Sequence, residues 1–283
     1  MVFAESRNQP ICDVPSIGIG NKPIDGGNYL FTEQEKADFI QQEPESAQFF
    51  RRWYGSDEFI NNRLRWCLWL GDCSPAELRK MPKCLERVEN VRQLRLASKS
   101  AGTQKIALTP TRFHVENMPK GNFLIIPSTS SERRQYVPIG FVTPENMGSN
   151  AVLIVTDATL YHFGVLTSSV HMAWMRTVGG RLKSDYRYSK DIVYNNFPWP
   201  ELTEDHRSKI ESTAQGILDA RAAFPDCSLA DLYNETAMPP ALRKAHQAND
   251  RAVLSAYGFT SRMTESDIVA RLMERYQQMT QSR

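Results

Sequence analysis

The spacing of apolar residues changes from mixed to helical near position 200. Before that point it predicts helices over 32–40, 45–52, 83–100 and 167–178 and strands over 65–70, 123–126, 135–142, 151–156, 159–163 and 192–194. After it, capping residues and apolar stripes predict helices over 203–224, 240–257 and 264–280. The pattern therefore predicts an α/β (α+β) mixed domain, residues 1–200, followed by a small all-α helical domain, residues 201–283.

Composition narrows the class of protein. The chain has 283 residues, of which 41% are hydrophobic and 23% charged, as in ordinary globular proteins. No apolar run approaches the roughly 18 residues that span a membrane, and the first ten residues lack the features of a secretory signal. We therefore expect a cytoplasmic protein with no membrane partner. The five cysteines show no CxxC spacing, so we expect free thiols and no metal site.

The net charge of +2 conceals a basic middle of the chain. Residues 79–140 carry twelve Lys and Arg against four Glu, and residues 176–190 carry five against one Asp. Such an asymmetry is typical of a surface that faces a polyanion. A solvated face crossed by salt bridges would have the same composition, so charge alone leaves both interpretations open.

The motifs of several enzyme classes are absent from the sequence. It contains no GxxxxGK[ST] phosphate loop, no GxSxG elbow, no HExxH pair, no zinc-deaminase pattern and no lysine with an acid two residues before it, as one class of nucleases requires. Residues 196–199 have the composition of a methyltransferase base clamp in the wrong order, without a cofactor glycine loop. His162 and His171 are expected in or beside the core. We therefore expect no catalytic residue in this chain.

The most informative segment is residues 179–189, which follows a predicted helix. In extended backbone Lys183, Asp185 and Arg187 would project from one face, opposite the tyrosines. A cation donates to guanine O6 and N7, and a carboxylate accepts from cytosine N4, so Lys183 and Asp185 have the chemistry to read one G·C pair. The alternative is a surface ion pair above packed tyrosines.

Two further basic clusters have the chemistry of phosphate binding. Residues 130–135 lie between predicted strands and combine adjacent arginines with hydroxyl side chains, which suits contacts that fix register without reading sequence. On the helix predicted over 83–100, a basic face is expected opposite an apolar one. The predicted contacts to the DNA backbone are Ser131, Arg133, Arg134, Arg181, Arg92, Arg95 and Lys99.

The chain resembles a known family through six motifs in order. They are GNKPIDGG (20–27), RWCLW (65–69), SSERR (130–134), LYHFGVL (160–166), GRLKSDYRYS (180–189) and NNFPWP (195–200), with DRAV (250–253) and AYG (256–258) in the helical part. Over essentially all 283 residues the sequence is similar to the target recognition and C-terminal domains of MmeI-like enzymes, which are type II restriction–modification proteins with an adenine-specific DNA methyltransferase.

The resemblance implies roles for individual residues. The loop that matches residues 183–187 varies in the family with the DNA sequence recognised. The positions of Lys183 and Asp185 act as a pair on one base pair, and Arg187, with a small residue matching Ala151, is implicated at another. Readout of double-stranded DNA by Lys183, Asp185, Arg187 and Ala151 is therefore expected.

The chain also departs from the family pattern. Family members carry nuclease, methyltransferase and spacer regions ahead of this part, and these are not in the sequence. Methyl transfer is therefore expected to need a methyltransferase domain, in cis or in trans and possibly with a nuclease, that binds S-adenosylmethionine and the extruded adenine. No cofactor is expected in this chain. Two alternatives stay open: a module that docks onto a methyltransferase without touching DNA, and an independent enzyme whose site the sequence does not reveal.

Overall fold

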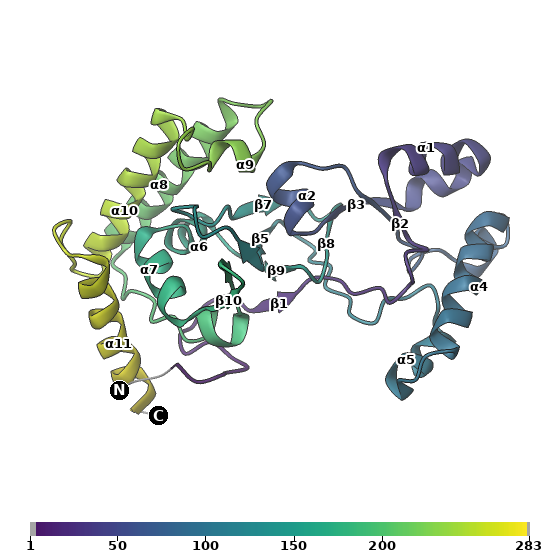
Figure 1. The fold of residues 1–283 in the computed structure, drawn as a ribbon, viewed down its shortest axis with the longest axis horizontal. Coiled ribbons are helices and arrows are strands. Elements are labelled where there is room, and N and C mark those ends of the chain that lie inside the picture. Colours follow the sequence, from purple (N-terminus) through teal and green to yellow (C-terminus); the bar gives the residue numbers. More distant parts are fainter. Residues whose placement is uncertain (1–3, 282–283) are drawn as a thin grey trace. The chain divides into compact units, whose positions relative to one another are not determined.

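The computed structural model describes residues 4–281, which form two compact units (Figure 1). Unit 1 comprises the residues up to Gly18, Gly121–Val142 and the residues from Leu153 onward. Unit 2 comprises Ile19–Lys120 and Thr143–Val152. The C-terminal helices thus belong to the same compact unit as part of the α/β region, and the domain boundary expected at residue 200 stays a prediction.

Unit 1 combines helices with a four-stranded sheet of order β1-β9-β5-β7. The strands are β1 (Ile17–Ile19), β9 (Val152–Val155), β5 (Phe123–Pro127) and β7 (Gly140–Val142). The helices are α6 (Leu160–Leu166), α7 (Ser169–Val178), α8 (Glu204–Ala222), α9 (Leu229–Leu232), α10 (Pro240–Ala256) and α11 (Glu265–Gln281), with a π-helical turn η3 (Lys190–Tyr194). Both β5 and β9 are buried throughout, which explains their unbroken apolar sequences.

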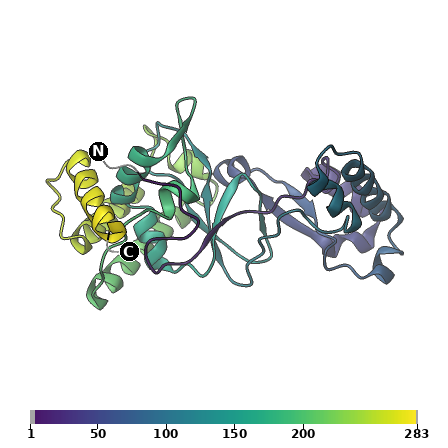
Figure 2. The same ribbon diagram turned by 90° about the horizontal axis from the view of Figure 1, so that it is seen from below.

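The C-terminal helices cover the other helices of unit 1. Helix α8 packs against α10 and α6, and α11 (yellow in Figures 1 and 2) packs against α7. A small sheet of order β10-β11-β6 completes the unit; its strands are β10 (Gly180–Leu182), β11 (Asp185–Arg187) and β6 (Thr129–Ser130). This small sheet carries the residues of the predicted recognition segment.

Unit 2 is built on a sheet of order β2-β4-β3-β8 and an aromatic core. Its strands are β2 (Leu30–Phe31), β4 (Trp66–Leu68), β3 (Phe50–Tyr54) and β8 (Met147–Gly148). Its helices are α1 (Glu33–Gln42), α2 (Ser56–Asn61), α3 (Pro75–Leu78), α4 (Pro82–Leu96) and α5 (Ala101–Lys105), with 3-10 helices η1 (Pro44–Phe49) and η2 (Ile106–Leu108). Edge-to-face aromatic pairs such as Trp69 with Phe113, at 4.8 Å between ring centroids, fill its interior.

The structure confirms the predicted fold class, a mixed α/β region followed by helices. The C-terminal helices begin and end where their local signals indicate. Thr203 caps α8 by accepting a hydrogen bond from the His206 amide at 3.2 Å, and Pro240 occupies the first turn of α10. Gly258, with φ of +69°, follows the end of α10 in the left-handed region that favours glycine.

The strand predicted over 159–163 is wrong, because these residues begin helix α6. Thr159 precedes the helix, and its amide donates to His162 Nδ1 at 3.0 Å. A short run that is apolar on all sides has no periodicity to distinguish a strand from a buried helix. Gly164 lets the helix approach its neighbours, since a Cβ there would lie 2.7 Å from Ile210 Cγ2.

Three other predicted elements also differ from the structure. The strand predicted over 192–194 is the π-helical turn η3, in which the Ser189 hydroxyl accepts from the Ile192 amide. The strand predicted over 135–142 is limited to β7, after Pro138, which has no amide to donate to a sheet. The helix predicted over 45–52 is η1 followed directly by β3.

Candidate nucleic-acid interface

The recognition segment forms a tight β-hairpin. Strands β10 and β11 pair antiparallel with Leu182 opposite Asp185, so Lys183 and Ser184 make a two-residue turn. Lys183 has φ of +56°, a left-handed conformation that is uncommon outside glycine. The expectation that Lys183 alternates with Asp185 and Arg187 along one extended strand is therefore wrong. Asp185 and Arg187 do share a strand face, and the exposed Lys183 lies at the hairpin tip beside them.

Two buried tyrosines hold the base of the hairpin. Tyr186 and Tyr188 are 9% and 4% exposed and belong to the core of unit 1. Tyr188 Oη lies 2.9 Å from His171 Nε2, and burial lowers the pKa of His171 to about 3, which keeps that ring neutral. Gly179 connects α7 to the hairpin. A residue with a side chain does not fit there, since a Cβ would lie 2.5 Å from the Met175 carbonyl oxygen. The hairpin therefore stands on a rigid base.

The fold brings the second basic cluster against this hairpin. Strand β11 pairs with β6, with Tyr186 opposite Ser130, so the loop over residues 131–135 begins beside the hairpin. Arg181 links the two: its Nη1 lies 3.7 Å from the Glu132 carboxylate and donates to the Ser184 carbonyl at 2.8 Å. Its guanidinium also lies 3.8 Å from the centroid of the Tyr186 ring. We call residues 129–135 and 180–187 together the hairpin–loop surface.

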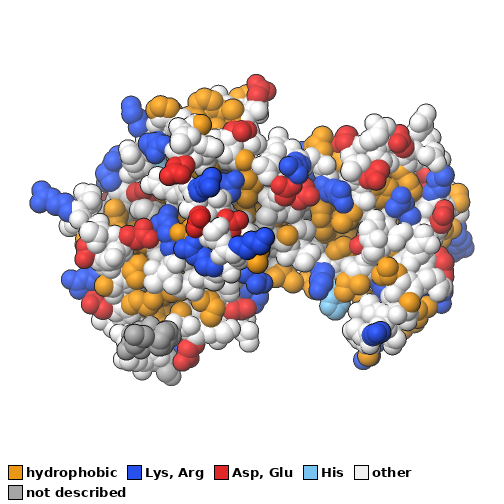
Figure 3. All heavy atoms as spheres, in the orientation of Figure 1, with side chains coloured by type: hydrophobic (Ala, Val, Ile, Leu, Met, Phe, Trp, Pro, Cys, Tyr) orange, Lys and Arg blue, Asp and Glu red, His pale blue; other side chains and the backbone are white. Residues whose placement is uncertain are grey.

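Charges on the hairpin–loop surface are mixed rather than uniformly basic. In Figure 3, Lys and Arg side chains gather with Asp and Glu side chains over β10. Burial lowers the pKa of Arg134, and the charge of Asp185 nearby opposes that shift, which places the two groups within electrostatic reach. Arg133 is exposed, and its amide donates to Ser131 Oγ at 3.3 Å. Acceptor and donor side chains thus lie together, as base and phosphate contacts require.

Ala151 belongs to unit 2 and is exposed at the turn between β8 and β9. Its amide donates to Ser149 Oγ at 3.1 Å, and its carbonyl accepts from Ser56 Oγ at 2.6 Å. The turn is therefore fixed on both sides of Ala151, and the small side chain leaves that surface open.

Helix α4 does not present the expected row of three basic side chains. Arg95 is completely buried, and all five of its N–H groups donate to backbone carbonyls. The acceptors are the carbonyl oxygens of Pro23, Ile24, Ile106, Thr109 and Arg112, at 2.7 to 3.1 Å. The predicted phosphate contact of Arg95 is therefore wrong, because the guanidinium holds loops of unit 2 together and has no N–H left to donate.

The other two members of that expected basic face are exposed. Arg92 pairs with Glu89 one helical turn earlier, at 3.1 Å, and Lys99 lies beyond the end of α4. Their phosphate contacts stay predictions.

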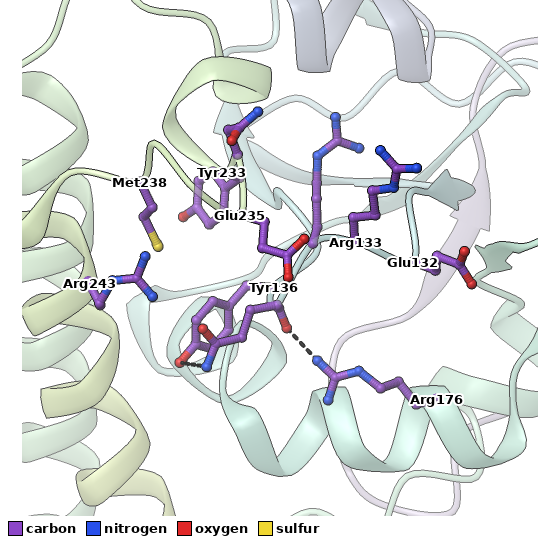
Figure 4. Close-up of a pocket in the computed structure, with 11 residues that line it drawn as sticks. Glu132, Arg133, Tyr136, Arg176, Tyr233, Glu235, Met238 and Arg243 are labelled. Atoms are coloured by element: carbon purple, nitrogen blue, oxygen red, sulfur yellow. Dashed lines mark hydrogen bonds between the residues drawn. The ribbon is translucent and has the colours of Figure 1, made fainter.

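The structure adds two arginines that sequence reasoning did not select. Arg176, in the last turn of α7, and Arg243, in the first turn of α10, line a cavity of about 320 Å³ together with Arg133 and Arg134 (Figure 4). Arg176 donates to the Gln135 carbonyl at 2.5 Å and pairs with Glu265 at 2.9 Å. No local motif marks these residues, because the fold assembles them from three separate segments.

Within residues 4–281, no three His, Cys, Asp or Glu side chains are grouped so that they could hold a metal ion. No helix among the same residues is long and apolar enough to cross a membrane. Cys67 and Cys84 are buried, whereas Cys227 is exposed.

Comparison with known proteins shows which class of protein this chain resembles: a target recognition domain followed by a C-terminal domain. Residues 1–201 match the family model of the MmeI target recognition domain, and residues 202–282 match that of the MmeI C-terminal domain. The chain therefore belongs to the MmeI family.

Two longer proteins are similar to nearly the whole chain. DNA methyltransferase A of Bacillus subtilis (strain 168) is 39% identical over 280 residues, which are 99% of this chain and 32% of that protein. The structure of the Type IIL restriction–modification enzyme MmeI in complex with DNA matches with a TM-score of 0.96 and 48% identity, over 99% of this chain and 37% of that one. The chain thus spans about a third of the length of each.

Proposed function

We propose that this chain is the sequence-specific DNA recognition portion of a restriction–modification DNA methyltransferase. The observation that carries the proposal is the hairpin–loop surface, in which Asp185, Lys183 and Arg187 lie on a hairpin beside the arginines of loop 131–135. The 48% identity to MmeI, whose structure was solved with DNA, supports the same role.

The readout residues have separate parts in this proposal. Lys183 donates to guanine O6 or N7, and Asp185 accepts from cytosine N4, so together they specify one G·C pair. Arg187 reads a second base pair, at which Ala151 leaves room. Arg133, Arg134, Ser131 and Arg181 contact phosphates and fix the register of the duplex, and Arg92 and Lys99 add contacts from unit 2.

In this proposal, catalysis is carried out by domains that this chain does not contain. We assign S-adenosylmethionine binding, transfer of a methyl group to adenine, and any DNA cleavage to domains that act in cis or in trans. A cytoplasmic location follows from a substrate that is cellular DNA. The residues of this chain hold the duplex and set which adenine is presented.

Selection from a randomised duplex pool by the purified chain, at low and moderate salt, tests this function. Enrichment of a short asymmetric motif that contains G·C positions is the expected result. Salt-sensitive binding without enrichment would contradict sequence readout by the chain alone. No binding at low salt would contradict DNA recognition and favour a module that only docks onto a methyltransferase.

A further inference from the structure

The arginine cavity beside the hairpin–loop surface is built from the α/β region and from the C-terminal helices of unit 1. Arg133 and Arg134 come from the loop after β6, Arg176 comes from α7, and Arg243 comes from the first turn of α10. The connection between α9 and α10 supplies the remaining wall, which includes Tyr233, Asn234, Glu235 and Met238. A ligand in this cavity would therefore contact the C-terminal helices as well as the loop.

The cavity has a cationic character that internal pairing does not remove. Four arginines line it against two glutamates; Glu132 is already paired with Arg181, and Arg176 is already paired with Glu265 outside the lining. Within residues 4–281 the structure describes no ion pair for Arg133, Arg243 or Glu235, whose carboxylate points into the cavity in Figure 4. An anion bound there would meet guanidinium groups that have N–H donors to spare.

A buried polar network fixes the walls of the cavity. The Tyr136 hydroxyl donates to Asp250 Oδ2 at 2.6 Å, and its ring stacks on His246 at 4.1 Å between centroids. Tyr233 Oη lies 2.7 Å from His246 Nε2 and accepts from Arg221 Nε at 2.8 Å. Because the side chains of Tyr136, Tyr233 and His246 are buried, this wall of the cavity is held in place before a ligand binds.

We propose that this cavity binds a backbone phosphate of the DNA duplex, so that Arg243 extends the interface into the C-terminal helices. This inference rests on the proposed function. Phosphate is the anion that planar guanidinium groups match with paired hydrogen bonds. A phosphodiester of DNA fits better than a free anion, because loop 131–135 supplies Arg133 and Arg134 and begins directly beside the recognition hairpin. Glu235 weakens the contact by repelling the phosphate.

Titration of labelled duplex into the full chain and into Arg243→Gln, over a series of salt concentrations, tests the inference. The substitution should weaken binding about tenfold on specific and scrambled duplexes alike, and should lower the slope of log K against log salt by about 1. Lys244→Gln, which removes one exposed charge from the adjacent position of α10, should change neither quantity.

A second variant keeps the test valid if Arg243→Gln alters the fold. Glu235→Gln should tighten binding to both duplexes several-fold, whereas Asp226→Asn, in the exposed turn after α8, should leave it unchanged.

The outcomes separate the two proposals. If the parent chain binds DNA and Arg243→Gln behaves like Lys244→Gln, the inference is overturned and the proposed function stands. If Arg243→Gln weakens binding of inorganic phosphate but not of duplex, the assignment to DNA is overturned. A parent chain that fails to bind duplex at low salt would overturn both.

Discussion

Arg95 of helix α4 and Arg133 of loop 131–135 are held in opposite ways. Arg95 donates all five N–H groups to backbone carbonyls and is completely buried, so it stabilises the loops of unit 2. Arg133 is exposed and, within residues 4–281, has no ion pair. What separates an arginine that stabilises the fold from one available to a ligand is therefore the number of N–H groups that the protein itself uses.

The largest effect is expected from removing the buried guanidinium. Arg95→Ala removes a donor from five carbonyl groups and opens a cavity, so unit 2 should lose about 3 kcal/mol or more of its unfolding free energy. Urea denaturation measures the loss, and hydrogen exchange assigns it to unit 2. Arg92→Ala on the same helix, where the ion pair with Glu89 is exposed, should cost less than about 0.5 kcal/mol. Equal losses in the two variants would show that the buried hydrogen bonds of Arg95 stabilise unit 2 no more than the exposed ion pair of Arg92.

The second largest effect is expected on the base pair that the hairpin selects. Exchange of the two charges, Lys183→Glu with Asp185→Lys, should change the preferred base pair at one position by about 1–3 kcal/mol and leave other positions unchanged. Selection from a randomised duplex pool measures the change. The matched control exchanges an exposed ion pair on α11, Arg271→Glu with Glu274→Arg. A uniform loss of affinity at all positions would show that the pair contacts only the backbone.

Acid should lower the unfolding free energy of unit 1, by less than the change expected for Arg95→Ala in unit 2. Burial lowers the pKa of His171 to about 3 and that of His246 well below its usual value, and both lie in unit 1. The unfolded chain takes up these protons below about pH 6.5 and the folded chain does not, so stability is complete above pH 6.5 and falls toward pH 3. The His171 ring should cost unit 1 about 2 kcal/mol at pH 5, and His246 should add to the loss in the same direction.

Urea denaturation at several pH values measures this dependence. Burial raises the pKa of Asp250, so the folded state binds that proton more readily and offsets part of the loss at lower pH. His171→Gln should reduce the number of protons taken up on unfolding by nearly one, so the unfolding free energy should depend less steeply on pH. The substitution should also lower stability at pH 7. An unchanged slope would show that His171 is not held neutral.

The two exposed arginines should differ in their contribution to DNA binding. Arg133→Gln should weaken binding by about 1 kcal/mol and lower the salt slope by about 1, as loss of one phosphate contact does. Arg92→Gln should have about half that effect, because Glu89 already occupies part of its guanidinium. Binding of labelled duplex over a range of salt concentrations measures both. A larger effect of Arg92 would place the stronger backbone contact in unit 2.

The C-terminal helices were predictable because their signals are local. Thr203, Pro240 and Gly258 act through the dihedral preferences and hydrogen bonds of their own neighbours, so the sequence places these helix ends within a few residues. The same reasoning fails for α6, because an apolar segment carries no periodicity when neighbours cover every side.

The site was predictable in composition and not in geometry. The sequence selects residues 183–187 and 130–134, but only the pairing of β11 with β6 shows that they meet. The burial of Arg95 depends on carbonyl groups in two loops outside α4, and the cavity depends on Arg243 from a third segment. Such contacts are properties of tertiary structure, which periodicity along one helix does not contain.

The smallest expected effect tests the turn that presents Lys183. A side chain at φ of +56° costs about 1 kcal/mol, and glycine removes that strain while adding freedom to the unfolded chain. Lys183→Gly should therefore change the unfolding free energy by less than about 0.5 kcal/mol, and Lys183→Ala, which keeps the strain, should be no more stable than the glycine variant. Both variants lack the ammonium group and should lose discrimination at the same base pair. If alanine proved more stable than glycine in urea denaturation, the tip of the hairpin would not be held in the left-handed conformation, and the position assigned to Lys183 beside Asp185 would have to be abandoned.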